Sequence, residues 1–493
     1  MPGVPLGRWA PDAADLNQIG QIQVAKNVLP TANGYKPRKK LASYSSAAAS
    51  AERVLSAFGA RDISGSTSIF CGDSAALYKL DSSALDFNDV SHANGYSVTD
   101  GELWSWARFG DRALAATGGE TIQWIDIDAG ASFATLTGSG VPNARYLGVV
   151  GPCLVAGSDN ADPTLVKWCG VEDVTGWDVG VNSADQQQMP EGGWVRGIIS
   201  GKEVGYVFQD EIIRRMIYTG DAQVFRFDVI ERNVGLKAPY SVVQVGSLVF
   251  YLSDEGFMKF DGEQSVPIAR EIVDEWFKAL ANPDKIAEIT GAPDLNDTKI
   301  YWAFVSNDNA TSSPDIVMTY DWLLDQWTYQ EMDVDCLFNF SPAGLTLEGL
   351  DAAYGTDIDA LDSLISSFDN LTSLADEFGA FTNDHYLSRF GTQNAAAQIT
   401  TAEWEMFDGR RGLLRAVHPL IDNANITAKA AARDRLADTQ TFGSAASMRR
   451  DGRIPLRASG NSVALQFDVP ADETWTHFQG FRFEGVPRGR TGL

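Results

Sequence analysis

Residues 246–261 read GSLVFYLSDEGFMKFD, and their pattern predicts a β-hairpin. Residues 248–253 alternate between two faces, as side chains do along a strand, and the polar turn Asp254, Glu255 and Gly256 follows. Residues 257–260 then continue as a second strand that ends at Asp261. A single hairpin is at best marginally stable in water, so we expect its apolar faces to pack against further units of the same kind.

The same order of strand, polar turn and strand occurs in five further copies, which begin at Gly65, Gly110, Gly151, Gly201 and Asp297. In each copy the second strand carries two apolar residues three positions apart. These pairs are Leu77 and Leu80, Ile122 and Ile125, Leu165 and Trp168, Ile213 and Met216, Phe257 and Phe260, and Val317 and Tyr320. Their first members are separated by 45, 43, 48, 44 and 60 residues. This period is close to the roughly 40–50 residues of a four-stranded propeller blade.

The sequence therefore predicts an all-β fold with a β-propeller of about six blades. A helical solenoid would need amphipathic helices where these copies alternate with a period of two. One helix is expected within the longest spacing, because the apolar residues of REIVDEWFKALA, at 270–281, recur at helical intervals. Those residues are Ile272, Val273, Trp276, Phe277 and Leu280.

Changes in residue composition and in apolar alternation along the chain predict four parts. Residues 1–50 form an arm punctuated by proline and glycine, which we expect to contribute to a platform and to contacts between subunits. The propeller follows over 51–345, and an acidic segment rich in leucine and aspartate occupies 346–390. Alternating stretches such as SVALQFDV predict a second β domain over 391–493.

Charge is distributed unevenly over the 493 residues. The formal net charge is −26, yet residues 1–60 carry +4 and residues 389–493 carry +3, so the middle carries −33. Such a balance argues against a surface that wraps nucleic acid, which needs Lys and Arg to neutralise phosphates. Between Lys299 and Arg389 there is no Lys or Arg, while sixteen Asp or Glu occur. That interval is either a solvated acidic surface or the wall of a lumen that must not retain a polyanion.

Motifs that carry chemistry are sparse. The sequence has no GxSxG elbow, no P-loop and no HExxH helix, and its four histidines, His92, His385, His418 and His477, are scattered. The aspartates at 357, 359 and 362 lack the calcium-loop pattern that ends in Glu. We therefore predict no catalytic residue, no metal site and no cofactor.

The cysteines and the apolar content bear on the compartment. Cys71, Cys153, Cys169 and Cys336 lie in or beside strand-like runs without metal-ligand spacing, so we expect buried free thiols. No run of 18 apolar residues occurs, and the N-terminus lacks an apolar signal region. The sequence thus predicts neither a signal peptide nor a membrane span, and synthesis in a cytoplasm.

Several stretches, taken in order, resemble virion proteins of short-tailed phages. Residues 9–45, WAPDAADLNQIGQIQVAKNVLPTANGYKPRKKLASYS, resemble the opening of tail-tube, tail-nozzle and packaged-DNA stabilisation proteins. Residues 239–262, PYSVVQVGSLVFYLSDEGFMKFDG, are similar to their propeller hairpins. REIVDEWF, GAPDLNDTKIYWAFVS, DIVMTYDWLLDQWTYQE and LDSLISSFDNLTSLA then follow in the order typical of that family. The resemblance covers most of the chain.

This resemblance implies a structural, non-enzymatic head-to-tail connector in the virion tail, assembled in the host cytoplasm. Copies of the chain, six by this expectation, would form a ring below the portal and its adaptor. The ring would extend the DNA channel, retain the genome without sequence-specific binding, and dock tail fibres or a needle. The channel-lining candidates are Asp351, Asp357, Asp359, Asp362, Asp369 and Asp376. The candidates for contacts between subunits are Trp9, Tyr35, Lys36, Arg38, Lys39 and Lys40.

Two other functions stay open at this point. A propeller can also carry a phage glycan depolymerase or glycosidase, because fold alone does not fix function. Such an enzyme would need a cleft with two carboxylates roughly 5–10 Å apart, flanked by aromatic rings that stack on sugars. The third alternative is a propeller that serves as a binding module.

Overall fold

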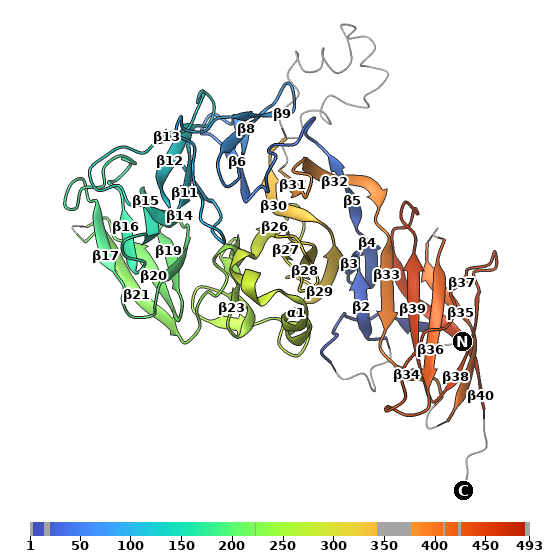
Figure 1. Ribbon diagram of the computed structural model, residues 1–493. Helices are drawn as coiled ribbons and strands as arrows, with labels where there is room; N and C mark the ends of the chain where they lie inside the picture. Colours follow the sequence, from blue (N-terminus) through green and yellow to red (C-terminus); the bar gives the residue numbers. More distant parts are fainter. Residues whose placement is uncertain are drawn as a thin grey trace.

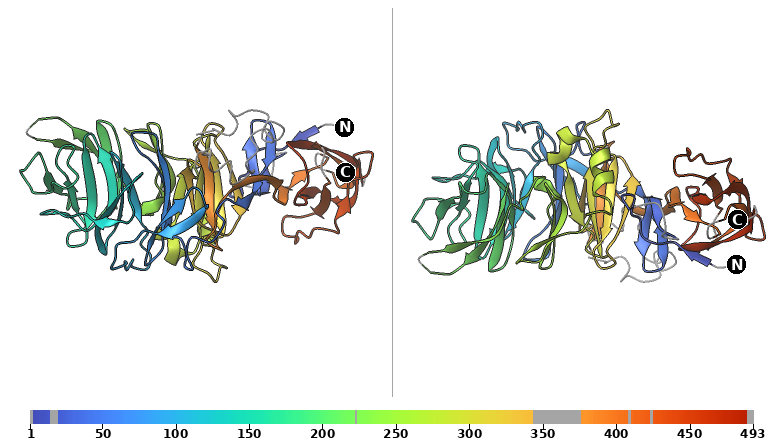
Figure 2. Two further views of the ribbon diagram at one scale, coloured as in Figure 1. Left: turned by 90° about the horizontal axis from the view of Figure 1, so that it is seen from above. Right: turned by 90° about the horizontal axis from the view of Figure 1, so that it is seen from below.

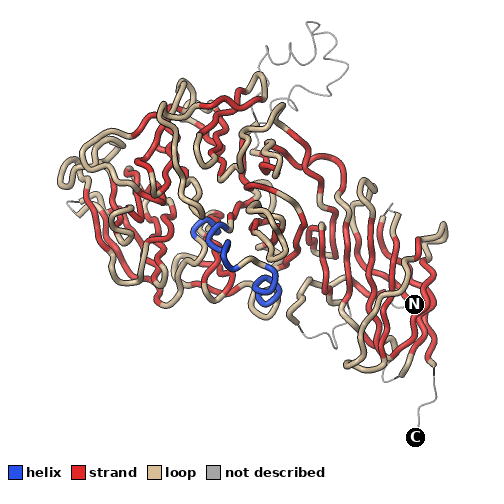
Figure 3. Tube along the Cα trace, in the orientation of Figure 1, coloured by secondary structure: helices blue, strands red, loops and turns tan. Residues whose placement is uncertain are grey.

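The computed structural model describes residues 3–13, 20–221, 223–342, 376–407, 410–422 and 425–488. The chain is nearly all β, as the sequence predicts, and its strands form many antiparallel sheets (Figures 1 and 3). The predicted inserted helix is present but short, at α1 Asp274–Leu280. Two 3₁₀ turns, η1 Pro239–Ser241 and η2 Pro283–Glu288, complete the helical structure of the described ranges. No helix in these ranges is long and apolar enough to cross a membrane.

Five four-stranded antiparallel sheets follow one another along the chain, each with its strands in chain order. The strands are β6 Ser56–Arg61, β7 Thr67–Gly72, β8 Leu77–Asp81 and β9 Asp86–Asp89; β10 Ser105–Phe109, β11 Arg112–Thr117, β12 Glu120–Asp126 and β13 Ala134–Thr135; β14 Ala144–Val150, β15 Cys153–Asp159, β16 Leu165–Trp168 and β17 Asp185–Gln188; β18 Val195–Ile199, β19 Val204–Gln209, β20 Ile212–Tyr218 and β21 Phe225–Arg232; β22 Val243–Val245, β23 Leu248–Ser253, β24 Gly256–Phe260 and β25 Ser265–Pro267. The predicted hairpins supply the second and third strand of each sheet.

A sixth and a seventh unit follow. The sixth comprises β26 Thr290–Pro293, β27 Lys299–Phe304, β28 Ile316–Asp321 and β29 Gln326–Glu331. The seventh comprises β30 Val334–Phe340, β31 Glu377–Thr382, β32 Leu387–Asn394 and, from the arm, β5 Lys39–Ser43. The hairpin pattern missed this unit because residues 341–376 separate its first two strands and its fourth strand is distant in sequence. Strand pairing therefore crosses the predicted boundary at residue 345.

Neighbouring units stack face to face, which explains the apolar pairs three positions apart. Residues separated by an odd number of positions point to opposite faces of a strand. Phe257 packs on Trp302 of the sixth unit, with ring centroids 4.8 Å apart. Phe260 packs on Phe208 of the fourth unit at 5.9 Å. Each sheet is thus buried on both faces, and β30 of the seventh unit lies beside β6 of the first (Figure 1).

The C-terminal part contains two sheets that pack against each other. One has the order β3 Val28–Thr31, β4 Gly34–Pro37, β40 Phe478–Pro487, β35 Gly412–Ile421 and β38 Ile454–Gly460, with β1 Gly3–Pro5 paired to β40. The other contains β2 Ile22–Lys26, β33 Ala397–Thr401, β39 Ser462–Val469, β36 Thr427–Arg433 and β37 Ala446–Ser447, with β34 Trp404–Glu405 paired to β39. Phe467 packs on Phe478 and Phe481 across the two sheets, with centroids 5.3 and 5.5 Å apart.

Strand β2 joins the two lobes seen in Figure 2. It pairs with β29 in parallel, at Lys26 and Tyr329, and with β33 in the antiparallel sense. The sixth unit and one C-terminal sheet consequently form one sheet of ten strands. The N-terminal residues are therefore built into both lobes: β5 completes the seventh unit, β2 pairs with a strand of each lobe, and β1, β3 and β4 belong to a C-terminal sheet.

Gly34 provides a test of the packing between the β3–β4 hairpin and β40. Its φ is +117°, and a Cβ there would lie 2.2 Å from the carbonyl oxygen of Phe478. We expect Gly34→Ala to lower the free energy of unfolding by about 2–3 kcal/mol, because strain and a backbone clash add. Gly65 is the matched control, since its φ is +97° but no atom lies within 4 Å of the added Cβ. Gly65→Ala should cost about 1 kcal/mol in urea unfolding; equal losses would contradict the clash.

Candidate functional site

The predicted contact residues Trp9 and Tyr35 are buried within the chain. Trp9 is 0% exposed, donates its indole N–H to the carbonyl of Gln23 at 3.0 Å, and packs against both Trp276 and Tyr329, which also contact each other. Tyr35 is 1% exposed and donates its hydroxyl to the carbonyl of Gly7 at 2.8 Å; burial raises its pKa above the ordinary value. Their observed contacts hold the arm to the rest of the chain, and a role between subunits stays a prediction.

Helix α1 is capped by the arm. The carboxylate of Asp12 accepts hydrogen bonds from the backbone N–H groups of Glu275 at 2.7 Å and Trp276 at 2.9 Å. The residue before the helix, Val273, has no side chain able to cap it. The helix sequence alone gives no sign that its cap lies more than 260 positions away.

The predicted lysines of the arm are also paired within the chain. Lys36 binds Asp297 at 3.2 Å, Lys39 donates to Asn394 Oδ1 at 2.6 Å, and Lys40 binds Asp472 at 2.8 Å. Each lysine thus reaches a different strand or loop: Asp297 precedes β27, Asn394 ends β32, and Asp472 precedes β40. The basic cluster is divided among three places in the fold.

Asp297 gives a pH-dependent prediction. Burial acts to raise its pKa, but the hydrogen bond from Lys299, that from the Thr298 N–H and the charges of Lys299 and Lys36 outweigh burial and lower the pKa to about 2. A carboxyl whose folded pKa is depressed stabilises the fold above its unfolded pKa of 3.8, and this stability is lost as the pH falls toward 2. We expect Asp297→Asn to remove about 1 kcal/mol at pH 6, a value reduced for solvent screening.

Urea unfolding of both proteins at several pH values would measure this contribution. The difference in free energy of unfolding between the natural chain and Asp297→Asn should shrink between pH 5 and pH 3. A difference that is constant over this range would show that the carboxylate of Asp297 acts through hydrogen-bond geometry alone.

Arg38 has the most unusual environment of the predicted contact residues. It is 6% exposed, and its guanidinium carbon lies 3.5 Å from the ring centroid of Phe390 and 4.8 Å from that of Tyr301. Nη1 donates to the Tyr301 hydroxyl at 3.0 Å. Nε and Nη2 are buried without a hydrogen-bond partner, and among the described residues no carboxylate forms an ion pair with Arg38. No pattern in the sequence distinguishes Arg38 from the lysines beside it.

Five of the six channel-lining candidates, Asp351, Asp357, Asp359, Asp362 and Asp369, lie outside the described residues. Asp376 is the first residue of the described range 376–407. Its carboxylate accepts a hydrogen bond from the Ser341 hydroxyl and lies 3.6 Å from Arg61 Nη2. At this one position, the acidic side chain has a basic partner within the same chain.

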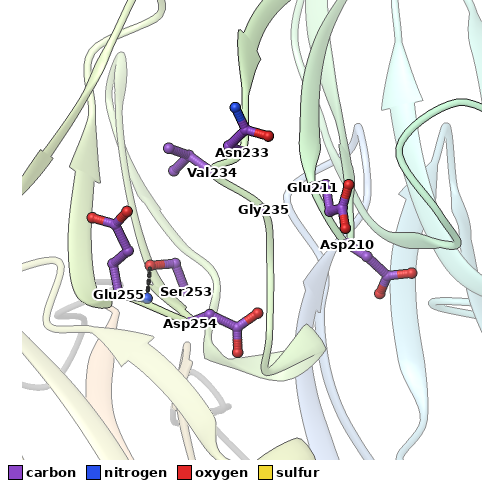
Figure 4. Close-up of a pocket in the computed structure, with 8 residues that line it drawn as sticks. All are labelled: Asp210, Glu211, Asn233, Val234, Gly235, Ser253, Asp254 and Glu255. Atoms are coloured by element: carbon purple, nitrogen blue, oxygen red, sulfur yellow. Dashed lines mark hydrogen bonds between the residues drawn. The ribbon is translucent and has the colours of Figure 1, made fainter.

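Figure 4 shows an acidic cavity of about 220 Å³ between the β19–β20 and β23–β24 turns. It is lined by Asp210, Glu211, Asn233, Val234, Gly235, Ser253, Asp254 and Glu255. Three of these carboxylates form ion pairs with basic side chains: Asp210 with Arg196 at 2.6 Å, Asp254 with Lys237 at 2.7 Å, and Glu255 with Arg270 at 2.9 Å. None of the eight lining residues is aromatic, so this cavity lacks the stacking surface that a glycosidase cleft needs.

A larger cavity of about 420 Å³ also contains acidic residues. It is lined by Phe109, Gly110, Asp111, Arg112, Asp126, Glu172, Asp173, Val174 and Thr175. The hydroxyl and N–H of Thr175 bind Asp173 and lower the pKa of its carboxyl below the usual range. A general acid in glycoside hydrolysis needs a raised pKa, so Asp173 is poorly suited to that role.

One buried acid–imidazole pair invites comparison with a catalytic triad. Asp335, 0% exposed, lies 2.5 Å from Nδ1 of His385 and accepts hydrogen bonds from the Ser313 hydroxyl at 3.0 Å and the Val54 N–H at 3.1 Å. Burial raises the pKa of Asp335, opposed by these hydrogen bonds. A triad serine bonds the imidazole, whereas Ser313 bonds the carboxylate. The contacts of Asp335 tie the segment before β6 to β30 and to the β31–β32 turn.

The four thiols are buried, and the residue types that bind metals are dispersed over the described part of the chain. Cys71, Cys153, Cys169 and Cys336 are free and buried, as predicted, and burial raises the pKa of each thiol. Across the part of the chain that the structure describes, no three His, Cys, Asp or Glu residues are grouped so that they could hold a metal ion.

The fold and these sites define an antiparallel all-β protein whose arm is integrated into two lobes. Comparison with known proteins adds no relative: no protein-family model matches the chain, and the curated proteins contain no similar sequence.

Proposed function

We propose that this chain is a structural virion protein of a tailed phage that forms a ring below the portal and its adaptor. In this proposal the seven stacked four-stranded units are the blades of a β-propeller, with β5 closing the last blade. The ring extends the DNA channel, retains the genome and offers docking surfaces to fibres or a needle. The basis for the phage assignment is the ordered resemblance of the sequence to such proteins.

The observation that carries the structural role is the joint between the lobes. A connector ring must keep its channel and its docking surfaces in fixed relation while DNA passes. Here β2 hydrogen-bonds to both lobes, and Trp9 is buried against Trp276 and Tyr329 beside that joint. A shared sheet resists relative motion more than a flexible linker does, which suits a protein that must keep its channel and docking surfaces in fixed relation.

The interval between Lys299 and Arg389, which has sixteen acidic residues and no Lys or Arg, supports the proposal that the chain lines a DNA channel. Basic side chains bind DNA phosphates in a salt-dependent manner, and a wall without them lets the duplex slide. If the segment at 346–375 lines the channel, lysines at Asp357, Asp359 and Asp362 should slow DNA ejection from particles, most strongly at low salt. A matched control with the same change in charge replaces the exposed residues Asp100, Asp254 and Glu275 by lysine. Equal ejection rates in the two variants would contradict a channel position.

Assembly provides the direct test of the proposed function. The mass of the native protein would be measured by light scattering or native mass spectrometry, alone and with an isolated portal–adaptor complex. We expect a ring-sized oligomer, or a monomer that becomes one only on that complex; portal without adaptor is the control. A monomer that does not bind the portal–adaptor complex and that degrades glycans would overturn the proposal in favour of a depolymerase.

A further inference from the structure

The C-terminal sheet that contains β35, β38 and β40 has a basic outer face. Each of these strands carries an exposed arginine directly after a residue of the core. The pairs of core residue and arginine are Leu414 and Arg415, Leu456 and Arg457, and Phe481 and Arg482. Successive side chains of a strand point to opposite faces, so the three arginines lie on the face turned away from the core. We call these three residues the arginine face.

The arginine face has little negative charge of its own. None of its three arginines forms an ion pair with a described residue. Glu484 is the acidic residue of the three strands, and its carboxylate is already bonded to His418 Nε2 at 2.9 Å and Arg453 Nη2 at 3.0 Å. Arg449 and Arg450 add two exposed arginines in the turn before β38. Positive charges gathered on one face attract an acidic surface and repel a basic one.

A complementary surface lies in the second and third units. The cavity of about 420 Å³ between the β10–β11 turn, the end of β12 and the β16–β17 loop contains four carboxylates, and we call it the carboxylate cavity. Its acidic residues are Asp111, Asp126, Glu172 and Asp173. None of them forms an ion pair with a described residue, and the basic lining residue Arg112 lies over the ring of Trp124 at 4.3 Å. The volume falls within the roughly 300–1,000 Å³ of pockets for drug-sized ligands, so the ends of arginine side chains fit.

The two surfaces lie at opposite ends of an elongated molecule. Figure 1 shows β16 and β17 at the left end and β38 and β40 at the right end, and both views in Figure 2 show the same separation. The arginine face of one chain therefore cannot reach the carboxylate cavity of the same chain. A contact between two different patches of identical copies is heterologous, and it repeats from copy to copy until a ring closes or a filament grows.

We propose that the arginine face of one copy docks on the carboxylate cavity of a second copy, so that the copies associate head to tail. Charge complementarity favours a second copy over nucleic acid, because the chain itself supplies the opposite charge: residues 61–388 carry −33, whereas residues 389–493 carry +3. This contact deepens the proposed function and rests on it for the closed ring, whereas association in pairs requires only the two surfaces.

Reversing the charge of each surface, and then of both in one chain, would test the contact. We expect Arg457→Glu with Arg482→Glu to weaken self-association at least about tenfold, because like charges then meet. Glu172→Arg with Asp126→Arg should have the same effect. A chain with all four substitutions again has opposite charges on its two surfaces, so its dissociation constant should return to within about threefold of the natural value. Such a recovery would exclude misfolding as the cause of the losses.

Sedimentation velocity over a concentration series would measure the dissociation constants. Lys202→Glu with Lys278→Glu is the matched control, because it makes the same change in net charge at exposed lysines outside both surfaces. This control should associate like the natural chain. Raising the salt concentration from about 0.05 M to about 0.3 M should weaken association of the natural chain, since salt screens charges that meet at a surface.

Several outcomes would overturn this docking. One is equal association of the natural chain and the reversed variants, and another is failure of the fourfold variant to recover. Loss of duplex DNA binding in Arg457→Glu with Arg482→Glu, with self-association unchanged, would assign the arginine face to nucleic acid instead.

Failure of the docking can be distinguished from failure of the proposed function. If the reversed variants still form the ring on the portal–adaptor complex, the docking is wrong and the proposed function stands. If the copies associate and the fourfold variant recovers, but the chain does not bind that complex, the docking stands and the proposed function does not. A natural chain that is monomeric both alone and with the complex would contradict both.

Discussion

A chain that begins at residue 46 is expected to be recovered as aggregated protein, not as a soluble folded lobe. The deletion removes β1 to β5, so β32 loses the strand that covers its edge, and β29 and β33 lose the strand that joins them. Unpaired strand edges template association with other chains. Soluble yield after expression, followed by near-ultraviolet circular dichroism, would measure the loss.

Cutting the chain instead of shortening it provides the control for this deletion. Ala51 and Glu52 are exposed, so a protease site inserted between them can be cleaved after folding. The severed arm should stay bound, because its hydrogen bonds and buried side chains remain in place. A soluble chain from residue 46 with an unchanged melting temperature would show that the arm contributes little to the fold and would return it to a role in assembly.

Trp9→Ala is expected to lower the free energy of unfolding of the isolated chain by about 3–5 kcal/mol, the usual cost of deleting a fully buried tryptophan. The substitution opens a cavity beside Trp276 and Tyr329 and removes the hydrogen bond to Gln23. Urea unfolding at neutral pH would measure the change. Because Trp9 lies beside both α1 and β2, the loss should affect the joint between the lobes.

Trp194 is the matched control for this substitution, since it is 49% exposed. Trp194→Ala should change the free energy of unfolding by no more than about 0.5 kcal/mol. If Trp9→Ala left the isolated chain as stable as this control but weakened its assembly, Trp9 would act between subunits, and its burial within the chain would be of little energetic importance.

Local patterns were reliable where structure depends on neighbours in sequence. The alternation over 246–261 predicted a hairpin, and β23 and β24 form it, with Ser253 paired to Gly256 around a two-residue turn. The helical spacing around Trp276 predicted α1, although the helix begins only at Asp274. Alternation and helical period report which residues share a face, and that property is encoded within a few residues.

The environment of Arg38 was less predictable from the sequence. The basic cluster at 36–40 drew attention to the arm, but its spacing does not reveal that Arg38 is buried on Phe390 and Tyr301 while Lys40 faces Asp472. Phe390 and Tyr301 lie more than 250 residues from Arg38 in the sequence, in β32 and β27. Nothing near Arg38 in the sequence indicates that such partners exist.

The sequence by itself determined the class of fold, the repeated hairpin and its period, the inserted helix and the buried thiols. Only the tertiary structure decided that a seventh unit exists, that β5 completes it, and that β2 joins the sixth unit to the C-terminal sheets. The physical reason is that a strand offers the same backbone donors and acceptors to every edge. Its side chains fix which face is buried, whereas its partner is chosen by the packing of the whole chain.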